Sequence, residues 1–455
     1  MQATAGAIEM ANGAIAQSGG GNIRYAATGA ITVGLLDARN AGAQGTWGSV
    51  SIVSGAAITD NAETDIDVYA NALRLNAVSG IATGGQHLET EAVLLSADAG
   101  TGGMYLDDAT ALEIGATAII TVNRVGADGV SVSARSDLAQ QGIVAGTQAV
   151  VGTTAGALLV SQAVTAAGNL ALSAGGDLDV DAAVASTGGA INLAAGGDLL
   201  QGANVTAQGL GKTIELVAAG DIVMAGGTQV TSNDANIALV AGGDLALSLV
   251  NAGTAGVRAS GASITDGDAD TDIVAGAALL TATGGIGAAT DAIELSVGTL
   301  SADAGTGGLF LAESNGLVID SVSIAVDGIA ATGVATTRTA AVQDGLQAGG
   351  AIVLTVNAGG LTLTADTGSV TAGGAVLLDA AGAIVANAAL DAGSHISVVG
   401  TSITQAAAGD FVSEGGTIDV QATAGAIEMA NGAIAQSGGG NIRYAATGAI
   451  TVGLL

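Results

Sequence analysis

The chain has 455 residues, of which 40 are acidic and nine are lysine or arginine, for a formal net charge of −31. So strong a negative charge excludes nucleic acid as a partner, because binding to phosphates requires clustered positive charge. The mean hydropathy is +0.59, yet no stretch of about 18 residues is free of glycine, polar or charged residues, so we expect no membrane-spanning helix.

The first and last segments of the chain carry the same sequence. Residues 2–36 and 421–455 are identical, and equivalent positions lie 419 residues apart. Identity at a fixed offset is typical of a repeat array. We therefore interpret residues 2–420 as one repeat unit and residues 421–455 as the start of the next identical unit.

A weaker repeat divides this unit into two diverged halves, about 2–212 and 213–416. No linker rich in proline, or in glycine and serine, separates the halves, so residues 1–455 are expected to form a single continuous body. The recurring segments are SADAGTGG at 96–103 and 301–308, and GAAITD or GASITD at 55–60 and 261–266.

The shortest period is about 22 residues. In the middle of the chain a Gly-Asp pair followed by leucine or isoleucine recurs at spacings of 21, 23 and 23 residues, and triplets such as Ile191-Asn192-Leu193 keep the same spacing. An apolar side chain at every second position indicates a strand with one buried face, and glycine, asparagine, aspartate and serine between the triplets indicate turns. This pattern predicts an all-β fold, a right-handed parallel β-helix or solenoid of about 20 rungs of roughly 22 residues.

The composition agrees with a stack of narrow rungs. The 75 glycines provide tight corners, and a 2% content of aromatic residues suits an interior too narrow for large rings. Proline is absent, as expected where the backbone N–H groups pair with the next rung. At about 4.8 Å for each rung, the stack would be a rod roughly 100 Å long.

Three phrases of the middle region resemble the repeats of the filamentous haemagglutinin family: GGAINLAAGGDL at 188–199, LALSAGGDL at 170–178 and ANIALVAGGDL at 235–245. These proteins are large secreted bacterial adhesins. The resemblance implies a right-handed β-helical shaft of a giant adhesin, located outside the cell or on the bacterial surface. The rungs here are longer and less even than the family's, and the family's amino-terminal secretion domain is not found in this sequence.

Two segments are densely acidic and offer candidate calcium ligands, because Ca²⁺ prefers several hard oxygen atoms. The EF-hand pattern fails, since its sixth position is Thr271 instead of glycine. A solvated acidic loop is the alternative interpretation. The candidate ligands are Asp266, Asp268, Asp270 and Asp272 in the second half, and Asp60, Glu63, Asp65 and Asp67 at the matching place in the first half.

Four aspartates of the Gly-Asp pairs recur once in each rung, at 177, 198, 221 and 244. They are interpreted as corner residues that accept hydrogen bonds from turn amides two residues further on, and a cation ladder is the less favoured alternative. His87 and His395, the two histidines, are about 14 rungs apart and are expected in exposed turns. Basic residues are scattered singly, so the sequence predicts no catalytic site and no cofactor other than the candidate Ca²⁺.

The sequence therefore predicts a structural or adhesive shaft segment of a giant, repetitive extracellular bacterial protein that mediates surface attachment or fibre formation. A calcium-stiffened matrix or coat protein is the alternative, and a polysaccharide-active β-helix enzyme is less favoured. Expected partners are neighbouring repeats of the same chain, end to end, and glycans or proteins of host or neighbouring cells. Loops that interrupt the rungs, at 37–51 with Trp47 and at 123–156 and 326–349, are the expected places for recognition.

Overall fold

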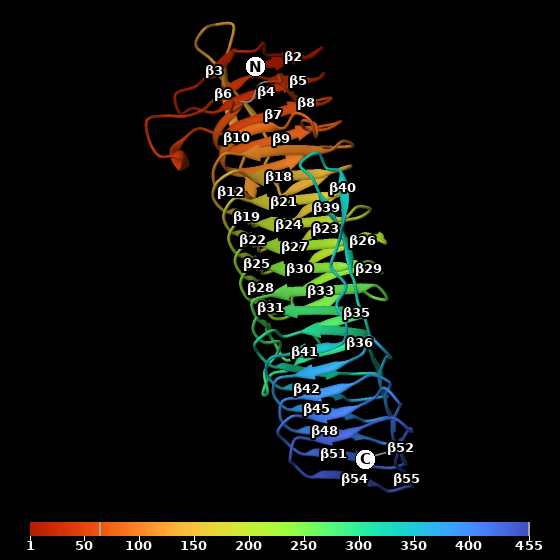
Figure 1. Ribbon diagram of the computed structural model, residues 1–455. Coiled ribbons are helices and arrows are strands. Elements are labelled where there is room, and N and C mark those ends of the chain that lie inside the picture. Colours follow the sequence, from red (N-terminus) through yellow and green to blue (C-terminus); the bar gives the residue numbers. More distant parts are fainter. Residues whose placement is uncertain (63–64, 454–455) are drawn as a thin grey trace. The chain divides into compact units, whose positions relative to one another are not determined.

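The computed structural model describes residues 1–62 and 65–453 and is built almost entirely of short β-strands (Figure 1). Among these residues the helical structure is one 3₁₀ turn, Gln44–Thr46. The chain divides into two compact units, the first formed by Met1–Gly220 with Asp327–Thr337 and the second by Asp221–Val326 with Arg338–Leu455. Both are parallel β-solenoids, and together they make about 20 turns spaced roughly 22 residues apart, which confirms the predicted fold class.

In the first unit, each regular rung contains three short strands, and each strand pairs in parallel with its equivalent in the next rung. Leu170 lies opposite Ile191, and Leu172 lies opposite Leu193. The three columns are β18 (Ala149–Thr153), β21 (Leu170–Ala174), β24 (Ile191–Ala195) and β27 (Ile214–Ala218); β19 (Leu158–Val160), β22 (Leu178–Val180) and β25 (Leu199–Gln201); and β17 (Ile143–Ala145), β20 (Val164–Ala166), β23 (Val184–Ser186) and β26 (Val205–Leu210).

The core of each rung is aliphatic because alternate side chains of every strand point inward. Leu178, Val180 and Val184, from two strands of one rung, are fully buried, and each such side chain contributes about 1.5–3 kcal/mol through burial. At the corners between strands, the backbone of one rung lies close to the backbone of the preceding rung. At Gly189 an added Cβ would lie 2.1 Å from the backbone carbonyl carbon of Gly168, so the stack admits only glycine there.

The second unit repeats this arrangement, with Ile352 opposite Val376 and Ile396 opposite Ile418. Its core accepts one large ring, Phe411, which is fully buried. Its columns include β42 (Ile352–Val356), β45 (Val376–Ala380), β48 (Ile396–Gly400), β51 (Ile418–Ala422) and β54 (Ile442–Ala446); β43 (Leu361–Leu363), β46 (Ile384–Ala386), β49 (Ile403–Gln405) and β52 (Ile427–Met429); and β41 (Leu346–Ala348), β44 (Val370–Ala372), β47 (Leu390–Ala392), β50 (Phe411–Ser413) and β53 (Ala435–Ser437).

The two identical segments form the same ladder. In the first unit, β1 (Gln2–Ala3) pairs with β4 (Ile23–Ala27) so that Gln2 lies opposite Ala26. In the second unit, β51 pairs with β54 so that Gln421 lies opposite Ala445, which is the same pair of positions 419 residues later. The second copy of the sequence therefore continues the ladder in the register of the first copy.

An antiparallel hairpin interrupts the rungs of the first unit. It consists of β14 (Ile120–Val125) and β15 (Val132–Asp137), with Ile120 opposite Asp137. The excursion predicted at 123–156 is therefore shifted towards the amino terminus, because the ladder resumes at β17. A second excursion, predicted at 326–349, likewise ends where β41 re-enters the ladder and pairs with β44.

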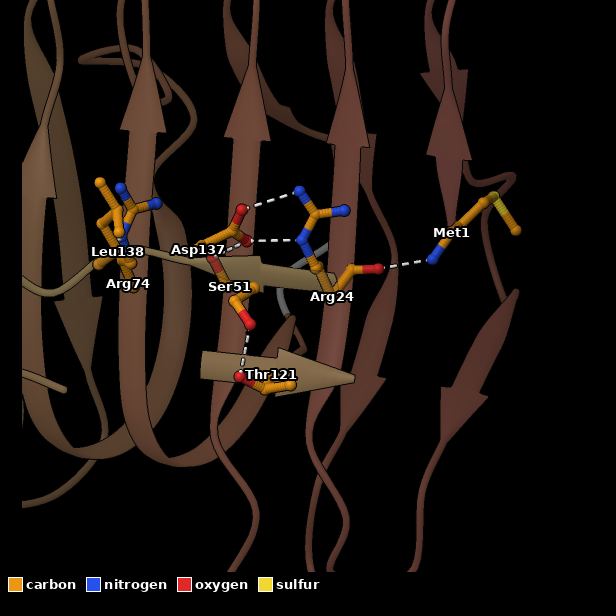
Figure 2. A network of polar contacts seen from close by, with 8 residues as sticks. Met1, Arg24, Ser51, Arg74, Thr121, Asp137 and Leu138 are labelled. Atoms are coloured by element: carbon orange, nitrogen blue, oxygen red, sulfur yellow. Dashed lines mark hydrogen bonds and ion pairs between the residues drawn. The ribbon is translucent and has the colours of Figure 1, made fainter. Parts of the chain in front are cut away.

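The hairpin folds back onto earlier rungs through polar contacts (Figure 2). Arg24 donates from Nε and Nη2 to the two carboxylate oxygens of Asp137, at 2.9 and 2.7 Å, and Ser51 donates to the same carboxylate at 2.8 Å. Arg74 donates to the carbonyl oxygen of Leu138 at 2.8 Å. A largely buried ion pair and contacts with three neighbouring rungs thus hold the base of the hairpin.

The second excursion packs on each unit separately. Within the first unit, Ile329 packs with Val150, Ala171 and Ala190, and the side-chain amide of Asn169 donates to the carbonyl of Gly333 at 3.0 Å. Within the second unit, Val322, Ile324 and Val326 pack with Ala238 and Leu279 in a buried cluster. The second excursion, predicted as a loop that interrupts the rungs, is therefore docked through apolar and polar contacts.

Candidate metal centres

Three carboxylates from consecutive rungs meet in the first unit. Asp60 ends β8 (Ile58–Asp60), Asp67 directly precedes β9 (Val68–Ala77), and Glu89 lies near the start of β10 (Leu88–Asp98). One oxygen from each side chain lies within 4.8 Å of the others. Asp67 is the most enclosed of the three, at 1% exposure, because the rungs on both sides cover it. We call these residues the first triad.

The second unit contains the same arrangement 205 or 206 residues further along the chain. Its members are Asp266 at the end of β34 (Ile264–Asp266), Asp272 directly before β35 (Ile273–Ala282), and Glu294 in β36 (Ile293–Asp303). Their oxygens also lie within 4.8 Å of one another, and Asp272 is fully buried. We call these residues the second triad.

The backbone fixes the central aspartate of each triad in the same way. One oxygen, Oδ2, accepts the backbone N–H of the glutamate in the next rung, at 3.1 Å for Asp67 with Glu89 and 2.8 Å for Asp272 with Glu294. The other oxygen, Oδ1, is buried, and no donor among the described residues reaches it in either triad. Oε2 of Glu89 and Oε2 of Glu294 are likewise buried with no donor among the described residues. Buried polar atoms without a hydrogen-bond partner are uncommon in folded proteins and call for an explanation.

The electrostatics of both triads oppose ionisation. Burial raises the pKa of Asp67 to about 8, and the carboxylates of Asp60 and Glu89 add to this effect. Burial likewise raises the pKa of Asp272 to about 9, with a further contribution from Asp266 and Glu294. An ionised carboxylate can only accept hydrogen bonds, so a shared proton or a bound cation would stabilise oxygens that converge in this way.

The structure places the predicted calcium ligands in different surroundings. Asp60, Asp67, Asp266 and Asp272 belong to the triads. Asp268 instead accepts hydrogen bonds from the Ser248 hydroxyl at 2.8 Å and the Gly227 N–H at 3.1 Å. Asp65 and Asp270 are exposed, and Glu63 lies outside the described residues.

The sequence interpretation missed the third member of each triad. Glu89 and Glu294 each follow the central aspartate by 22 residues, which is one rung. Parallel stacking places residues one rung apart next to each other. The rung period is therefore the signal that points to these glutamates, whereas closeness along the chain indicates only the aspartates.

The aspartates of the Gly-Asp pairs have the predicted structural role with a different donor. Oδ1 of Asp177 accepts the backbone N–H of Asp198 at 2.9 Å, and Oδ1 of Asp221 accepts that of Asp244 at 2.7 Å. The donors come from the next rung and not from two residues further on, so the side chains connect rungs in addition to shaping corners.

The prediction for His87 was wrong. His87 is buried, at 8% exposure, and its Nδ1 lies 2.8 Å from a carboxylate oxygen of Asp107. Its Nε2 lies 3.1 Å from the carbonyl oxygen of Ala331, in the second excursion. The hydrogen bond to Asp107 raises the pKa of the imidazole. His87 is buried because a segment 244 residues further along the chain covers it. His395 is exposed, as predicted.

The loop that carries Trp47 packs against the first unit. The guanidinium carbon of Arg39 lies 3.5 Å from the centre of the Tyr69 ring, and Trp47 contacts the same ring edge-on at a centroid distance of 6.2 Å. Arg39 also forms an ion pair with Asp37 at 2.9 Å, and this contact lowers the pKa of Asp37. Trp47 is therefore half-buried and held in place.

Within the described part of the chain, no helix has the length and apolar character needed to cross a membrane. Comparison of the sequence and structure with known proteins finds no matching family model, no matching curated protein and no matching solved structure.

Proposed function

We propose that the chain is a structural and adhesive shaft segment of a giant, repetitive extracellular bacterial protein that serves surface attachment or fibre formation. The observation that carries this proposal is the ladder between β51 and β54, in which the second copy of the repeated sequence adopts the register of the first copy. A further unit can be added in the same way, because each rung presents the same backbone groups to its neighbour.

The mechanism of such a shaft is mechanical. Parallel strands bonded to the rungs above and below, over a continuous aliphatic core, resist bending and extension together. One unit of 419 residues would add about 19 rungs, or about 90 Å at the usual strand spacing. Repetition multiplies weak contacts, because a second contact on the same chain forms at high effective concentration.

The charge of the chain favours separate shafts over dense packing of one shaft against another. A net charge of −31 keeps neighbouring shafts apart through repulsion and keeps them soluble. The resemblance of the 170–245 region to secreted adhesin repeats favours an extracellular or cell-surface location. Partners of the proposed shaft are neighbouring repeats along the chain and glycans or proteins on host or neighbouring cells.

Electron microscopy of chains with one, two and three repeat units tests the structural part. We expect rods of constant width whose length grows by about 90 Å for each unit. Globular particles, or beads joined by flexible links, would contradict the proposal. For the adhesive part, one three-unit chain is compared with three separate units at equal unit concentration. Longer retention of the three-unit chain on cell surfaces is expected, and equal retention would exclude adhesion through avidity.

A second candidate role, a calcium-stiffened matrix or coat protein, is favoured by the two buried carboxylate triads. In that role Ca²⁺ would stiffen each rod and promote lateral association by reducing the negative charge between rods. Microscopy of the same arrays with and without Ca²⁺ distinguishes the two roles. Bundles that form only with Ca²⁺ support the matrix role, whereas single rods under both conditions contradict it.

A further inference from the structure

We propose that the first triad, Asp60, Asp67 and Glu89, and the second triad, Asp266, Asp272 and Glu294, are two equivalent Ca²⁺ sites. Each ion would join consecutive rungs through carboxylate oxygens. The inference goes beyond the proposed shaft role and does not depend on it, because a solenoid can serve as a shaft with or without bound metal.

The first argument is the buried oxygen without a donor. Asp67 is 1% exposed and Asp272 is fully buried, and Oδ1 of each is buried with no donor among the described residues, in a side chain that converges with two other carboxylates. The N–H bond to Oδ2 holds each side chain in that orientation. A cation between the three carboxylates would give these oxygens a partner.

The second argument is the fit between the oxygens and Ca²⁺. Calcium binds oxygen at about 2.3–2.6 Å, so oxygens on opposite sides of the ion can be about 5 Å apart. The triad oxygens, all within 4.8 Å of one another, lie inside that limit. Three carboxylates leave positions for water, in agreement with the usual 6–8 oxygen ligands.

The third argument is recurrence in a changed context. The segment between the first two ligands has six residues in the first triad, at 61–66, and five in the second, at 267–271, with different sequences. Despite that difference the three carboxylates converge in both units. The acidic residues of the intervening loops, such as Asp268 and Asp270, are not part of this arrangement.

The fourth argument concerns charge. Three carboxylates within 4.8 Å repel each other strongly where burial limits solvation. A divalent cation offsets most of this repulsion. The rival state is a proton shared between carboxyl groups, which agrees with the raised pKa values of Asp67 and Asp272. The two states differ in a measurable way, because only one of them binds metal.

Calorimetric titration of the whole chain with CaCl₂ near neutral pH tests the proposal. We expect two Ca²⁺ ions for each wild-type chain, one for Asp67→Asn, one for Asp272→Asn and none for the double variant. Asp270→Asn is the matched control, because it removes one exposed charge near the second triad and should leave two sites. The titration extends to about 10 mM, above the dissociation constants of ~10⁻⁴–10⁻³ M typical of extracellular calcium modules.

Folding of each variant is checked by circular dichroism, and asparagine has nearly the shape of a protonated aspartate. If an asparagine variant does not fold, Glu89→Gln and Glu294→Gln replace it, since these side chains are only partly buried. The proposal would be overturned, in favour of shared protons, if the wild-type chain showed neither binding heat nor a shift in melting temperature at the highest Ca²⁺ concentration. Two bound ions in the double variant would also overturn it, by placing Ca²⁺ on the exposed loops.

Discussion

Arg24 and Arg443 provide a matched pair for testing how the first hairpin is held. They occupy the same position in the two identical segments, but their partners differ. Arg24 pairs with Asp137 at 2.7 Å, and the two side chains are 13% and 8% exposed. Arg443 pairs with Asp419, also at 2.7 Å, with exposures of 57% and 42%. We predict that Arg24→Ala releases the hairpin and that Arg443→Ala has little effect.

The expected magnitude follows from burial. Removing one partner of a buried ion pair costs about 3–5 kcal/mol, because the remaining charge is left without compensation. Asp137 keeps one hydrogen bond, from Ser51, so we expect about 3 kcal/mol for docking of the hairpin in Arg24→Ala. An exposed pair contributes about 0–1 kcal/mol, which is the expectation for Arg443→Ala.

Limited digestion with trypsin measures this difference, because Arg124 and Arg135 lie on exposed parts of the two hairpin strands. Cleavage needs a strand that is free to enter the protease, and release of the hairpin from the rungs favours that state, so a docking loss of about 3 kcal/mol raises the cleavage rate by up to about 100-fold. Arg443→Ala should change the rate less than about fivefold. Equal rates in both variants would refute the assignment of Asp137 as the anchor, and an Arg24→Ala, Asp137→Ala double-mutant cycle measures the coupling directly.

The remaining predictions concern the core, the corners and pH. Phe411→Ala should lower the free energy of unfolding by about 3–5 kcal/mol, since the ring is fully buried; denaturant titration checks this. Gly189→Ala should lower the free energy of unfolding by more than about 2 kcal/mol, because the added Cβ would lie 2.1 Å from backbone. Gly45→Ala is the control, because an added Cβ there meets nothing within 4 Å. A loss of stability in Gly45→Ala would contradict the reasoning. Burial raises the pKa of Asp108 from 3.8 to about 6 and that of Glu313 from 4.5 to about 7. The folded state therefore holds both protons more tightly, so their stabilisation is complete below about pH 4 and is lost as the pH rises through 6 and 7, by about 3 kcal/mol for each group. A flat stability profile between pH 4 and 8 would contradict this.

The solenoid could be predicted from the sequence because its determinants are local and periodic. Triplets such as Ile191-Asn192-Leu193 specify which side chains point inward, and their spacing specifies which strands pair. A one-residue slip would turn the buried side chains outward, so the pattern also fixes the register. Two of the three members of each triad could be predicted as acidic residues close together in the sequence, Asp60 with Asp67 and Asp266 with Asp272.

The remaining features depend on contacts that no local pattern encodes. Glu89 joins Asp67 because the rungs stack, and Arg24 joins Asp137 across 113 residues of chain. His87 is buried by a segment much further along the chain. The docking of the two excursions leaves no periodic pattern in the sequence, because it depends on a few side chains that contact distant rungs. The sequence indicates where the ladder is interrupted, but the docking of the interruption follows from tertiary packing.

The identical segments also show where the stability of a rung comes from. Ile23 is 8% exposed and Ile442, the same residue in the second copy, is 40% exposed, although only Ile442 lies opposite a residue of the strand before it, Ile418. The difference arises from the next strand: β4 is covered by β7 (Val50–Ser54), with Ile23 opposite Val50. The burial of a residue is therefore completed by its neighbour in the following rung, as nearest-neighbour stability in repeat proteins requires. Addition of a further unit would bury Ile442 as Ile23 is buried, so each added unit stabilises the one before it, which is the physical basis for the proposed array.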